Sequence, residues 1–486
     1  ANCSRISRRG FLTAGSLGIA GLSRPEVLAA EAKSKSGKSR KSIILIHLYG
    51  APSQLEWADM KPDAPLEIRG ELGGIPSSLP GCDVCELLPN HAKVMDRVTV
   101  LRSMTHPHPI HGVAYALTGT PSIDVAMELS PRDSRHWPFF GSVVDYVESQ
   151  SVDKASPIPN NIALPFRFSS NREGEVPRAG PYGAFLGAEY DPLWTDFAGT
   201  ATKGHEKTLR DMVYTDNDPY MGVADDCRFF LPAATRTDDS VTLDRLNHRK
   251  SLLTQLNDAI PQLVDSRAGH ELTRHQQSAL AILESDELSK ALDIRLEPAK
   301  TRELYGSTLF GQACLAARRL TEAGTRVATV FWDEYGLAGT GWDTHWNHYP
   351  RMKNELCPGF DMGWYGLITD LDQRGLLDET LIGWGVEFGR TIYSQGTLES
   401  NNYGRDHHGR CFTMWMAGGG VKPGLTFGGT DDFSYNVSHD PVHVHDLNAT
   451  VLHCMGIDHK KLTFKFKGRD FRLTDVHGNV VTPILR

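Results

Sequence analysis

Apolar runs that read as strands alternate with helical patterns along most of the chain. Ser42–Leu48 is a continuous apolar run, a pattern typical of a strand covered on both faces. Similar runs predict further strands at 98–101, 162–168, 325–332, 377–384 and 411–417. Apolar periodicity predicts helices at 139–147, 241–285, 301–323, 360–374 and 446–455, the last with Asp446 as its N-cap. This alternation predicts an α/β fold, a three-layer sandwich with a mostly parallel central sheet.

The first 30 residues have a different pattern. Adjacent arginines at Arg8 and Arg9 come directly before a short apolar run at 11–22, and small residues follow at 28–30. This order is typical of a twin-arginine signal peptide, so it predicts export by the twin-arginine translocase to the periplasm or the cell exterior. A basic amphipathic helix is the alternative interpretation.

The rest of the chain is predicted to be a linker at 31–41 and one α/β domain at 42–486, with a loop-rich insertion near 170–235. The chain has 486 residues, of which 40% are hydrophobic and 23% charged, and its net charge is −8. Because the basic residues after the leader are scattered, we expect no nucleic-acid partner. No later segment is apolar for long enough to predict a stable membrane span.

Carboxylates and imidazoles recur where predicted strands meet loops. In open α/β sheets, binding sites form beyond the carboxyl ends of the strands, so these side chains could converge. The candidates are Asp343 and His345 after the strand at 325–332, Glu387 and Arg390 after the strand at 377–384, and Asp406, His407 and His408 before the strand at 411–417.

Each of these candidates has a structural alternative. Asp343 and His345 would place an oxygen and a nitrogen ligand on one side of an extended segment, but a capping Asp beside an unrelated His is possible. Of His407 and His408, one is expected to be a ligand, because neighbours on a chain usually diverge; the alternative is a solvated loop. Glu387 and Arg390 would also satisfy each other as an ion pair.

Other polar groups give weaker signals. His111, at the end of a segment that also contains His106 and His108, stands at a predicted helix start and could contact substrate or metal. Ser53 follows Pro52, where a helix N-cap is favoured over a nucleophile. His443 and His445 precede a helix and are interpreted as structural.

Cys82 and Cys85 form the one close cysteine pair. A single pair is weak evidence for zinc, and in an exported protein it indicates a local disulfide or two free thiols. Nucleophile-elbow, phosphate-loop, dinucleotide-binding and haem-attachment motifs are absent from the sequence, which disfavours a redox-cofactor enzyme.

Several segments together resemble the family called domain of unknown function fifteen-oh-one. Besides the leader, they are 49–54, 59–62, 117–119, 341–345, 374–380, 387–391, 404–407 and 446–450. That family is similar in fold to the alkaline-phosphatase and sulfatase superfamily, whose members hydrolyse phosphate or sulfate esters with bound metals. The resemblance therefore implies an alkaline phosphatase/sulfatase-like domain.

The resemblance also implies roles for individual residues. Ser53 would lie near the nucleophile region, Asp343 and His345 would be the first later metal pair, and His407 would lie near the final histidine. Glu387-Phe388 stands where the superfamily has an Asp-His pair, so a complete second metal site is not expected. The formylglycine signature of sulfatases is absent.

The leading hypothesis is an exported metal-dependent hydrolase of phosphate or sulfate esters, with a small-molecule or glycan ester as substrate. The expected cofactor is a divalent metal, zinc in the first place, with manganese or calcium as alternatives. Metal-activated water or the Ser53 hydroxyl would be the nucleophile, and Arg390 or Arg405 would balance the anionic group. The predicted site consists of the catalytic residues Ser53, Arg390 and His111 and the metal ligands Asp343, His345, Glu387, Asp406 and His407. The alternatives are a non-catalytic binding or assembly protein and a redox protein using Cys82 and Cys85.

Overall fold

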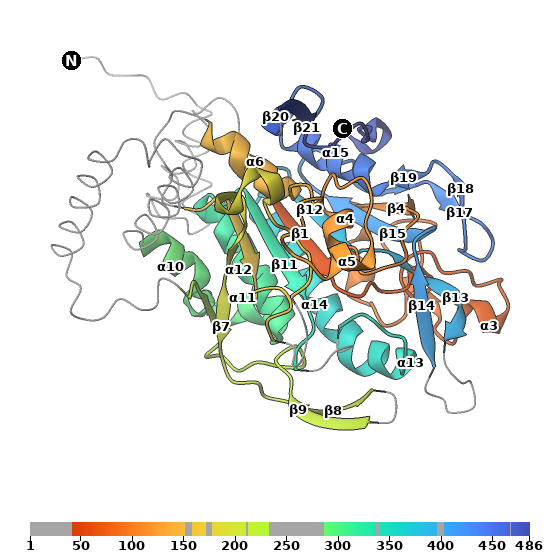
Figure 1. Cartoon of the computed structure of the whole chain (residues 1–486). Coiled ribbons are helices and arrows are strands. Elements are labelled where there is room, and N and C mark those ends of the chain that lie inside the picture. Colours follow the sequence, from red (N-terminus) through yellow and green to blue (C-terminus); the bar gives the residue numbers. More distant parts are fainter. Residues whose placement is uncertain are drawn as a thin grey trace, which may run out of the picture. The chain divides into compact units, whose positions relative to one another are not determined.

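A nine-stranded sheet organises the protein. The computed structural model describes residues 41–150, 158–171, 177–209, 212–232, 286–336, 341–395, 403–466 and 468–486. The strand order is β16 (Leu425–Phe427), β4 (Val98–Thr105), β15 (Phe412–Ala417), β12 (Thr380–Gly385), β1 (Ser42–Leu48), β11 (Val327–Trp332), β5 (Asn161–Leu164) and β6 (Leu193–Trp194), with β19 (Val442–His443) also paired to β4. β15 runs antiparallel to both of its neighbours, and every other pair in this sheet is parallel. The predicted mostly parallel sheet is confirmed (Figure 1).

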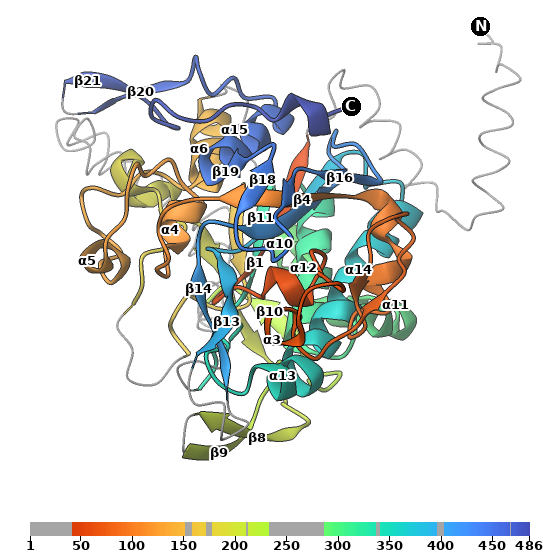
Figure 2. The same cartoon turned by 90° about the vertical axis from the view of Figure 1, so that its right-hand side faces the viewer.

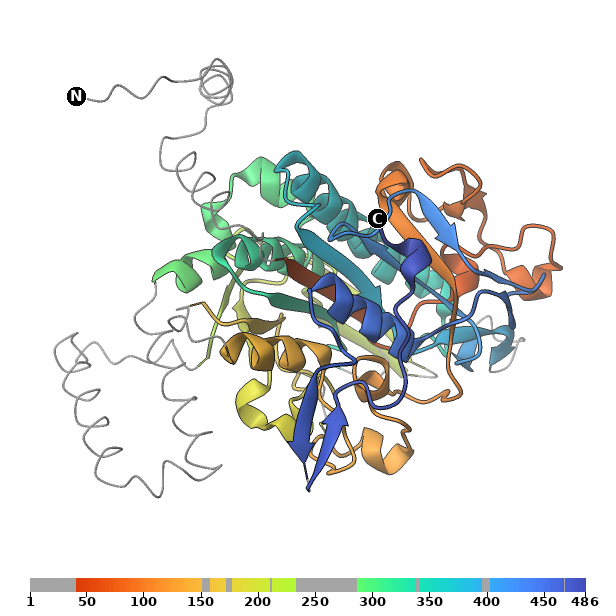
Figure 3. The same cartoon turned by 90° about the horizontal axis from the view of Figure 1, so that it is seen from above.

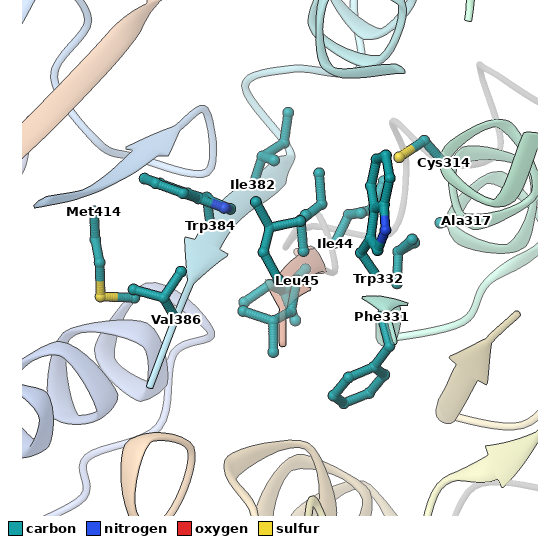
Figure 4. Packing of buried hydrophobic residues seen from close by; sticks show 14 of the residues in the cluster. Ile44, Leu45, Cys314, Ala317, Phe331, Trp332, Ile382, Trp384, Val386 and Met414 are labelled. Carbon is teal, nitrogen blue, oxygen red and sulfur yellow. The ribbon is translucent and has the colours of Figure 1, made fainter. Parts of the chain in front are cut away.

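β1 lies inside the sheet because its side chains, apolar except for Ser42 and His47, are buried on both faces. Its register places Ile44 beside Ala328 of β11 and Ile382 of β12. Figure 4 shows Leu45 of β1 among side chains of the two neighbouring strands. All seven residues of β1 are buried, so the core of Ser42–Arg486, which forms one compact unit, is built on this strand.

Helices cover the sheet on both sides. On one face α12 (Leu309–Ala323) packs against α14 (Cys357–Gln373) and against β11. On the other face α6 (Phe140–Ser149) packs against α15 (Val444–Cys454) (Figures 1 and 3). Thr308 caps the start of α12 by accepting the Gly311 N–H, and Gly324 ends it in the left-handed conformation. The three-layer α/β sandwich is therefore confirmed.

Smaller elements surround the sandwich. Short helices are α3 (Leu66–Arg69), α4 (Val113–Ala116), α5 (Val125–Glu128), α10 (Asp286–Leu292), α11 (Ala299–Leu304) and α13 (His348–Arg351). Two-stranded pairs are β2 (Gly74–Ile75) with β3 (Val84–Cys85), β7 (Asp196–Ala198) with β10 (Arg228–Phe230), β8 (Gly204–Leu209) with β9 (Met212–Asn217), β13 (Gly389–Gln395) with β14 (Gly404–His408), β17 (Gly429–Thr430) with β18 (Val437–His439), and β20 (Thr463–Phe466) with β21 (Arg469–Arg472).

Some predicted boundaries were wrong, for local physical reasons. The strand predicted at 162–168 ends at Leu164, because Pro165 has no N–H for the ladder. The helix predicted at 301–323 is split into α11 and α12, and Gly306 at φ 80° lies in the break. The helix predicted at 241–285 lies outside the described residues.

The start of α15 also differs from the prediction. His443, not Asp446, is its N-cap, and Asp446 instead accepts the His443 N–H from the third helical position. The two residues form a capping box, so the N-cap lies three residues before the predicted position. The solvated loop that was the alternative interpretation for the segment before β15 is instead a strand, β14, which pairs with β13.

Candidate metal centre

Most of the predicted site residues gather beyond the carboxyl ends of the parallel strands. His111 lies in the loop after β4, and Asp343 and His345 lie in the segment after β11. Glu387 follows the end of β12, and Arg390, Asp406 and His407 lie on the hairpin of β13 and β14. Figure 2 shows the two hairpin strands side by side. The sheet topology therefore brings together segments that are separated by up to 300 residues, which is the usual origin of a site in an open α/β sheet.

Asp343 is the hub of the cluster. Its Oδ1 lies 2.6 Å from Arg390 Nη2, 2.9 Å from His345 Nε2 and 3.1 Å from His407 Nε2. Its Oδ2 lies 3.2 Å from His111 Nε2. Burial alone would raise the pKa of this carboxyl, but His111 and Arg390 hold it well below its usual value. Asp343 is therefore an anion around which nitrogen atoms are arranged.

His345 and His407, which both lie near Asp343 Oδ1, have hydrogen-bond partners on Nδ1 that favour a lone pair on Nε2, the atom that faces the cluster. His407 Nδ1 lies 3.2 Å from the Pro109 carbonyl, which can only accept a hydrogen bond, so Nδ1 carries the proton. His345 Nδ1 is bonded in the same way to Gln395 Oε1. With the proton on Nδ1 of each ring, the two Nε2 atoms carry lone pairs, and they lie 2.9 Å apart and close to a carboxylate oxygen. Such a convergence of lone pairs is stabilised by a cation.

The donor set fits a zinc-like ion. Ligands arranged tetrahedrally about 2.1 Å from zinc lie about 3.4 Å from one another, close to the 2.9–3.1 Å measured among these three atoms. Burial lowers the pKa of His407 to about 4, so the ring is neutral, as a metal ligand must be. Two overlapping triplets, His111–Asp343–His407 and His345–Asp406–His407, have ligand atoms within 4.8 Å of one another.

Glu387, which was predicted as a metal ligand, contacts the cluster through His111, and its role as a ligand stays a prediction. Its Oε1 accepts the Gly50 N–H at 2.7 Å and lies 3.4 Å from His111 Nδ1, while its Oε2 lies 3.3 Å from His47 Nε2. Burial lowers the pKa of His111, but Asp343 and Glu387 reverse this and raise it to about 9. His111 is thus held between two carboxylates, and Glu387 orients it as outer carboxylates orient metal-site histidines.

Arg390 is fully buried, with 0% exposure of its side chain. Its Nε donates to the Ala51 carbonyl at 3.0 Å, its Nη1 donates to the Arg405 carbonyl at 3.0 Å, and its Nη2 donates to Asp343 and to the Gly50 carbonyl. The guanidinium therefore ties the segment after β1 to Asp343. The ion pair with Glu387, which was the structural alternative for these two residues, is replaced by the pair with Asp343.

Asp406 and Ser53 lie at the margin of the cluster or outside it. Asp406 is half-exposed, and its Oδ1 accepts the His407 N–H at 2.8 Å and lies 3.7 Å from His345 Nδ1. Ser53 is fully buried, caps a short helical turn by accepting the Leu55 N–H at 3.3 Å, and is also hydrogen-bonded to Glu56. Within the described residues, no contact joins Ser53 to the ligand atoms, so its role as nucleophile stays a prediction.

Sequence reasoning missed a buried network that supports the cluster. Glu56 Oε1 accepts Arg405 Nε at 2.9 Å and Nη2 at 2.5 Å, and Glu56 Oε2 lies 3.5 Å from His348 Nε2. His348 Nδ1 is 2.7 Å from Thr344 Oγ1, between the two residues of the Asp-x-His pair. Glu56 follows the first strand, but no pattern in the sequence indicated its burial, and its partner Arg405 lies 349 residues further along the chain.

The remaining candidates lie apart from the ligand atoms. Cys82 and Cys85 are buried free thiols, so the local disulfide is excluded and the alternative of two free thiols is confirmed. His108 packs on Tyr115, and His443 caps α15. His408 points away from His407, and its Nε2 is 2.7 Å from the Tyr435 carbonyl. Among the helices that the structure describes, none combines the length and apolar character needed to cross a membrane.

Comparisons with known proteins place the chain in a family and give distant structural likenesses. The family described as "Protein of unknown function (DUF1501)" matches residues 40–485. A search of curated proteins gives no match. Among solved structures, Ps i-CgsB has 11% identity, a TM-score of 0.39 and coverage of 86% of this chain and 72% of its own. The PsFucS1 sulfatase from Pseudoalteromonas sp. has 12% identity, a TM-score of 0.34 and coverage of 89% and 71%. These scores are too low to carry an inference about activity.

Proposed function

We propose that this chain, which belongs to the DUF1501 family, is an exported metal-dependent hydrolase of phosphate or sulfate esters. The observation that supports the proposal is the convergence of three potential ligand atoms, His345 Nε2, His407 Nε2 and Asp343 Oδ1, at 2.9–3.1 Å from one another. Two imidazoles and one carboxylate leave one position open on a tetrahedral ion, as in hydrolytic zinc sites. Zinc is therefore the proposed metal, with manganese or calcium as alternatives. The ester class comes from the family resemblance of the sequence.

The chain's own residues prepare this site for hydrolysis. When bound, a divalent cation activates water and withdraws charge from an ester oxygen. The Pro109 carbonyl and Gln395 keep the two histidines in the ligand tautomer, and Arg390 fixes the position of Asp343. His111 is the proposed proton carrier for the leaving group.

His111 suits this role because Glu387 holds its Nδ1 while its Nε2 faces the cluster. Water is the proposed nucleophile, since the Ser53 hydroxyl is buried and already hydrogen-bonded.

The location proposed for this activity is the periplasm or the cell exterior. It rests on the Arg8-Arg9 leader, and the twin-arginine translocase is the proposed export partner. We expect the Arg8→Lys/Arg9→Lys double variant to accumulate in the cytoplasm of a producing bacterium, as measured by cell fractionation. Export of that variant at the parental level would contradict the twin-arginine route.

The first test of the site is the metal content of the protein purified without chelator. We expect a stoichiometric divalent metal in the parent and its loss in Asp343→Ala/His407→Ala. His408→Gln is the matched control, because His408 lies next to His407 on β14 but bonds to the Tyr435 carbonyl. The metal-loaded parent and the control should hydrolyse 4-nitrophenyl phosphate or 4-nitrophenyl sulfate, and the double variant should not.

Two results would overturn the proposal. A parent that takes up no zinc, manganese or calcium would leave the converging lone pairs without a cation and would favour the binding or assembly protein. Equal metal content in the parent and in Asp343→Ala/His407→Ala would place the metal elsewhere.

A further inference from the structure

Gln54 follows β1, and its buried side chain bonds to the hairpin that carries Arg390 and His407. The residue is 2% exposed. Its Oε1 accepts the Arg390 N–H at 2.9 Å, and its Nε2 donates to the Arg390 carbonyl at 2.9 Å and to the Ser434 carbonyl at 3.2 Å. Both N–H donors of the amide are therefore used. The carboxamide binds both polar groups of the Arg390 backbone, as a residue of a neighbouring strand would.

Arg390 is the point at which this hairpin meets the proposed ligands. Its Nη2 donates to Asp343 Oδ1 at 2.6 Å, and in the register of β13 and β14 it lies opposite His407. His407 Nε2 is itself 3.1 Å from Asp343 Oδ1. A shift of the Arg390 backbone would therefore move a donor to Asp343 and a proposed ligand together.

Gln54 is itself held in place by Asp59. The Asp59 N–H donates to the Gln54 carbonyl at 3.1 Å, and Asp59 Oδ2 accepts the Ser434 hydroxyl. Ser434 is fully buried and has φ 56°, a backbone conformation that is rare for a residue with a Cβ and that surrounding contacts must hold. The carboxamide also packs closely on the hairpin, because a Cβ at Gly389 would lie 2.6 Å from Gln54 Oε1.

We infer that Gln54 is a positioning residue of the metal centre, whose carboxamide fixes Arg390 on β13 so that Arg390 and His407 meet Asp343. The inference rests on the proposed function, because it presupposes a metal bound at this cluster. Gln54 acts through Arg390 and does not itself bind the metal. Loss of such outer contacts weakens metal binding by about 10- to 100-fold.

The test compares two buried glutamines. Gln54→Met removes the three hydrogen bonds, and we expect it to weaken zinc binding by about tenfold or more in competition with a chromophoric chelator. Gln312→Met is the matched control: Gln312 lies on α12, is 4% exposed, and its Nε2 donates to the Arg302 and Gly306 carbonyls at 3.0 and 2.8 Å. Both variants should unfold at lower urea than the parent, but only Gln54→Met should lose zinc affinity.

Cobalt gives a second readout, which separates positioning from stability. Co²⁺ in place of zinc absorbs visible light, and the spectrum depends on the coordination geometry. We expect the folded, cobalt-loaded Gln54→Met protein to have a changed spectrum and Gln312→Met to keep the parental one. If Gln54→Met lowers the urea midpoint but keeps the parental zinc affinity and cobalt spectrum, its role is only structural and the inference is overturned.

Gln54→Glu keeps the proposal testable if Gln54→Met does not fold. This variant has the same length and retains an acceptor for the Arg390 N–H, but it has fewer donors for the two carbonyls. An added negative charge would by itself favour a cation, so zinc binding that is weaker by about threefold or more would report the lost donor. Parental or tighter zinc binding by Gln54→Glu would overturn the inference.

The outcomes for the parent separate the two proposals. Parental zinc binding that Gln54→Met leaves unchanged overturns the role of Gln54 and leaves the hydrolase proposal standing. Equal losses of zinc affinity in Gln54→Met and Gln312→Met would show a general effect of stability and would also overturn that role. If the parent takes up manganese or calcium in place of zinc, the same comparison is made with that metal. A parent that takes up none of zinc, cobalt, manganese and calcium overturns both proposals.

Discussion

At the scale of single residues, Glu56 connects the segments that carry the proposed metal ligands. It follows β1, its carboxylate binds Arg405 beside Asp406 and His407, and through His348 it reaches Thr344 beside Asp343. Burial alone would raise the pKa of Glu56, but Arg405 and His348 reverse this and lower it from 4.5 to about 2. The Glu56 carboxylate is therefore ionised in the folded protein at any pH at which it is ionised in the unfolded chain.

This shift predicts how stability depends on pH. The contribution of Glu56, about 3 kcal/mol from the size of the shift, is fully present above pH 4.5 and is lost as pH falls toward 2. We expect Glu56→Gln to be less stable than the parent at pH 7 by about this amount, with the gap closing below pH 4. Urea unfolding at a series of pH values measures this. Glu71→Gln, at a half-exposed pair with Lys353, should change stability by less than about 0.5 kcal/mol, and a constant gap for Glu56→Gln would contradict the prediction.

At the scale of elements, the site depends on close approach between the turn after β1 and the segment after β11. Gly50 has φ 92°, and a Cβ there would lie 2.3 Å from the Asp343 backbone nitrogen. Its N–H also donates to Glu387. Glycine is therefore required both for the left-handed backbone and for the contact with Asp343.

Gly50→Ala is expected to displace Asp343 and to weaken metal binding by at least about tenfold, as loss of outer-shell support does. Gly81→Ala is the matched control, since Gly81 has φ 77° but open space around the Cβ position. Both variants carry backbone strain of about 1 kcal/mol, but only the first should lose metal in competition with a chromophoric chelator. Equal metal affinities would show that the contact with Asp343 does not position the ligand.

At the scale of the whole molecule, the proposed metal joins the segment after β11, which carries Asp343 and His345, to the hairpin of β13 and β14, which carries His407. A cation that binds only the folded protein stabilises it by about 2.7 kcal/mol when its free concentration is one hundred times its Kd. Chelation should therefore lower the urea midpoint of the parent and of His408→Gln, and readdition of zinc should restore it. Asp343→Ala/His407→Ala should not respond to either treatment. If chelator leaves the urea midpoint of the parent unchanged, bound metal does not stabilise the fold, and the prediction is contradicted.

The local pattern of the sequence determined the architecture. The apolar run at 42–48 and the similar runs that follow were enough to predict a mostly parallel sheet with helices on both faces, because burial on two faces leaves no polar alternation. The same pattern placed Asp343, His345 and Glu387 after strands, where sites form. The predicted boundaries were wrong where a single residue begins or ends an element, as at Pro165, at Gly306 and at the capping box of His443.

Only the tertiary structure decided which polar groups face one another. Nothing in the chain near Arg390 indicated that its guanidinium would bind Asp343 and backbone carbonyls, because those partners come from other strands. The same holds for Pro109 and Gln395, which set the tautomers of His407 and His345. Periodicity reports burial along one element, whereas hydrogen bonds across long sequence separations depend on strand order and register. For that reason the sequence alone predicted the types of ligand, and the fold determined their roles.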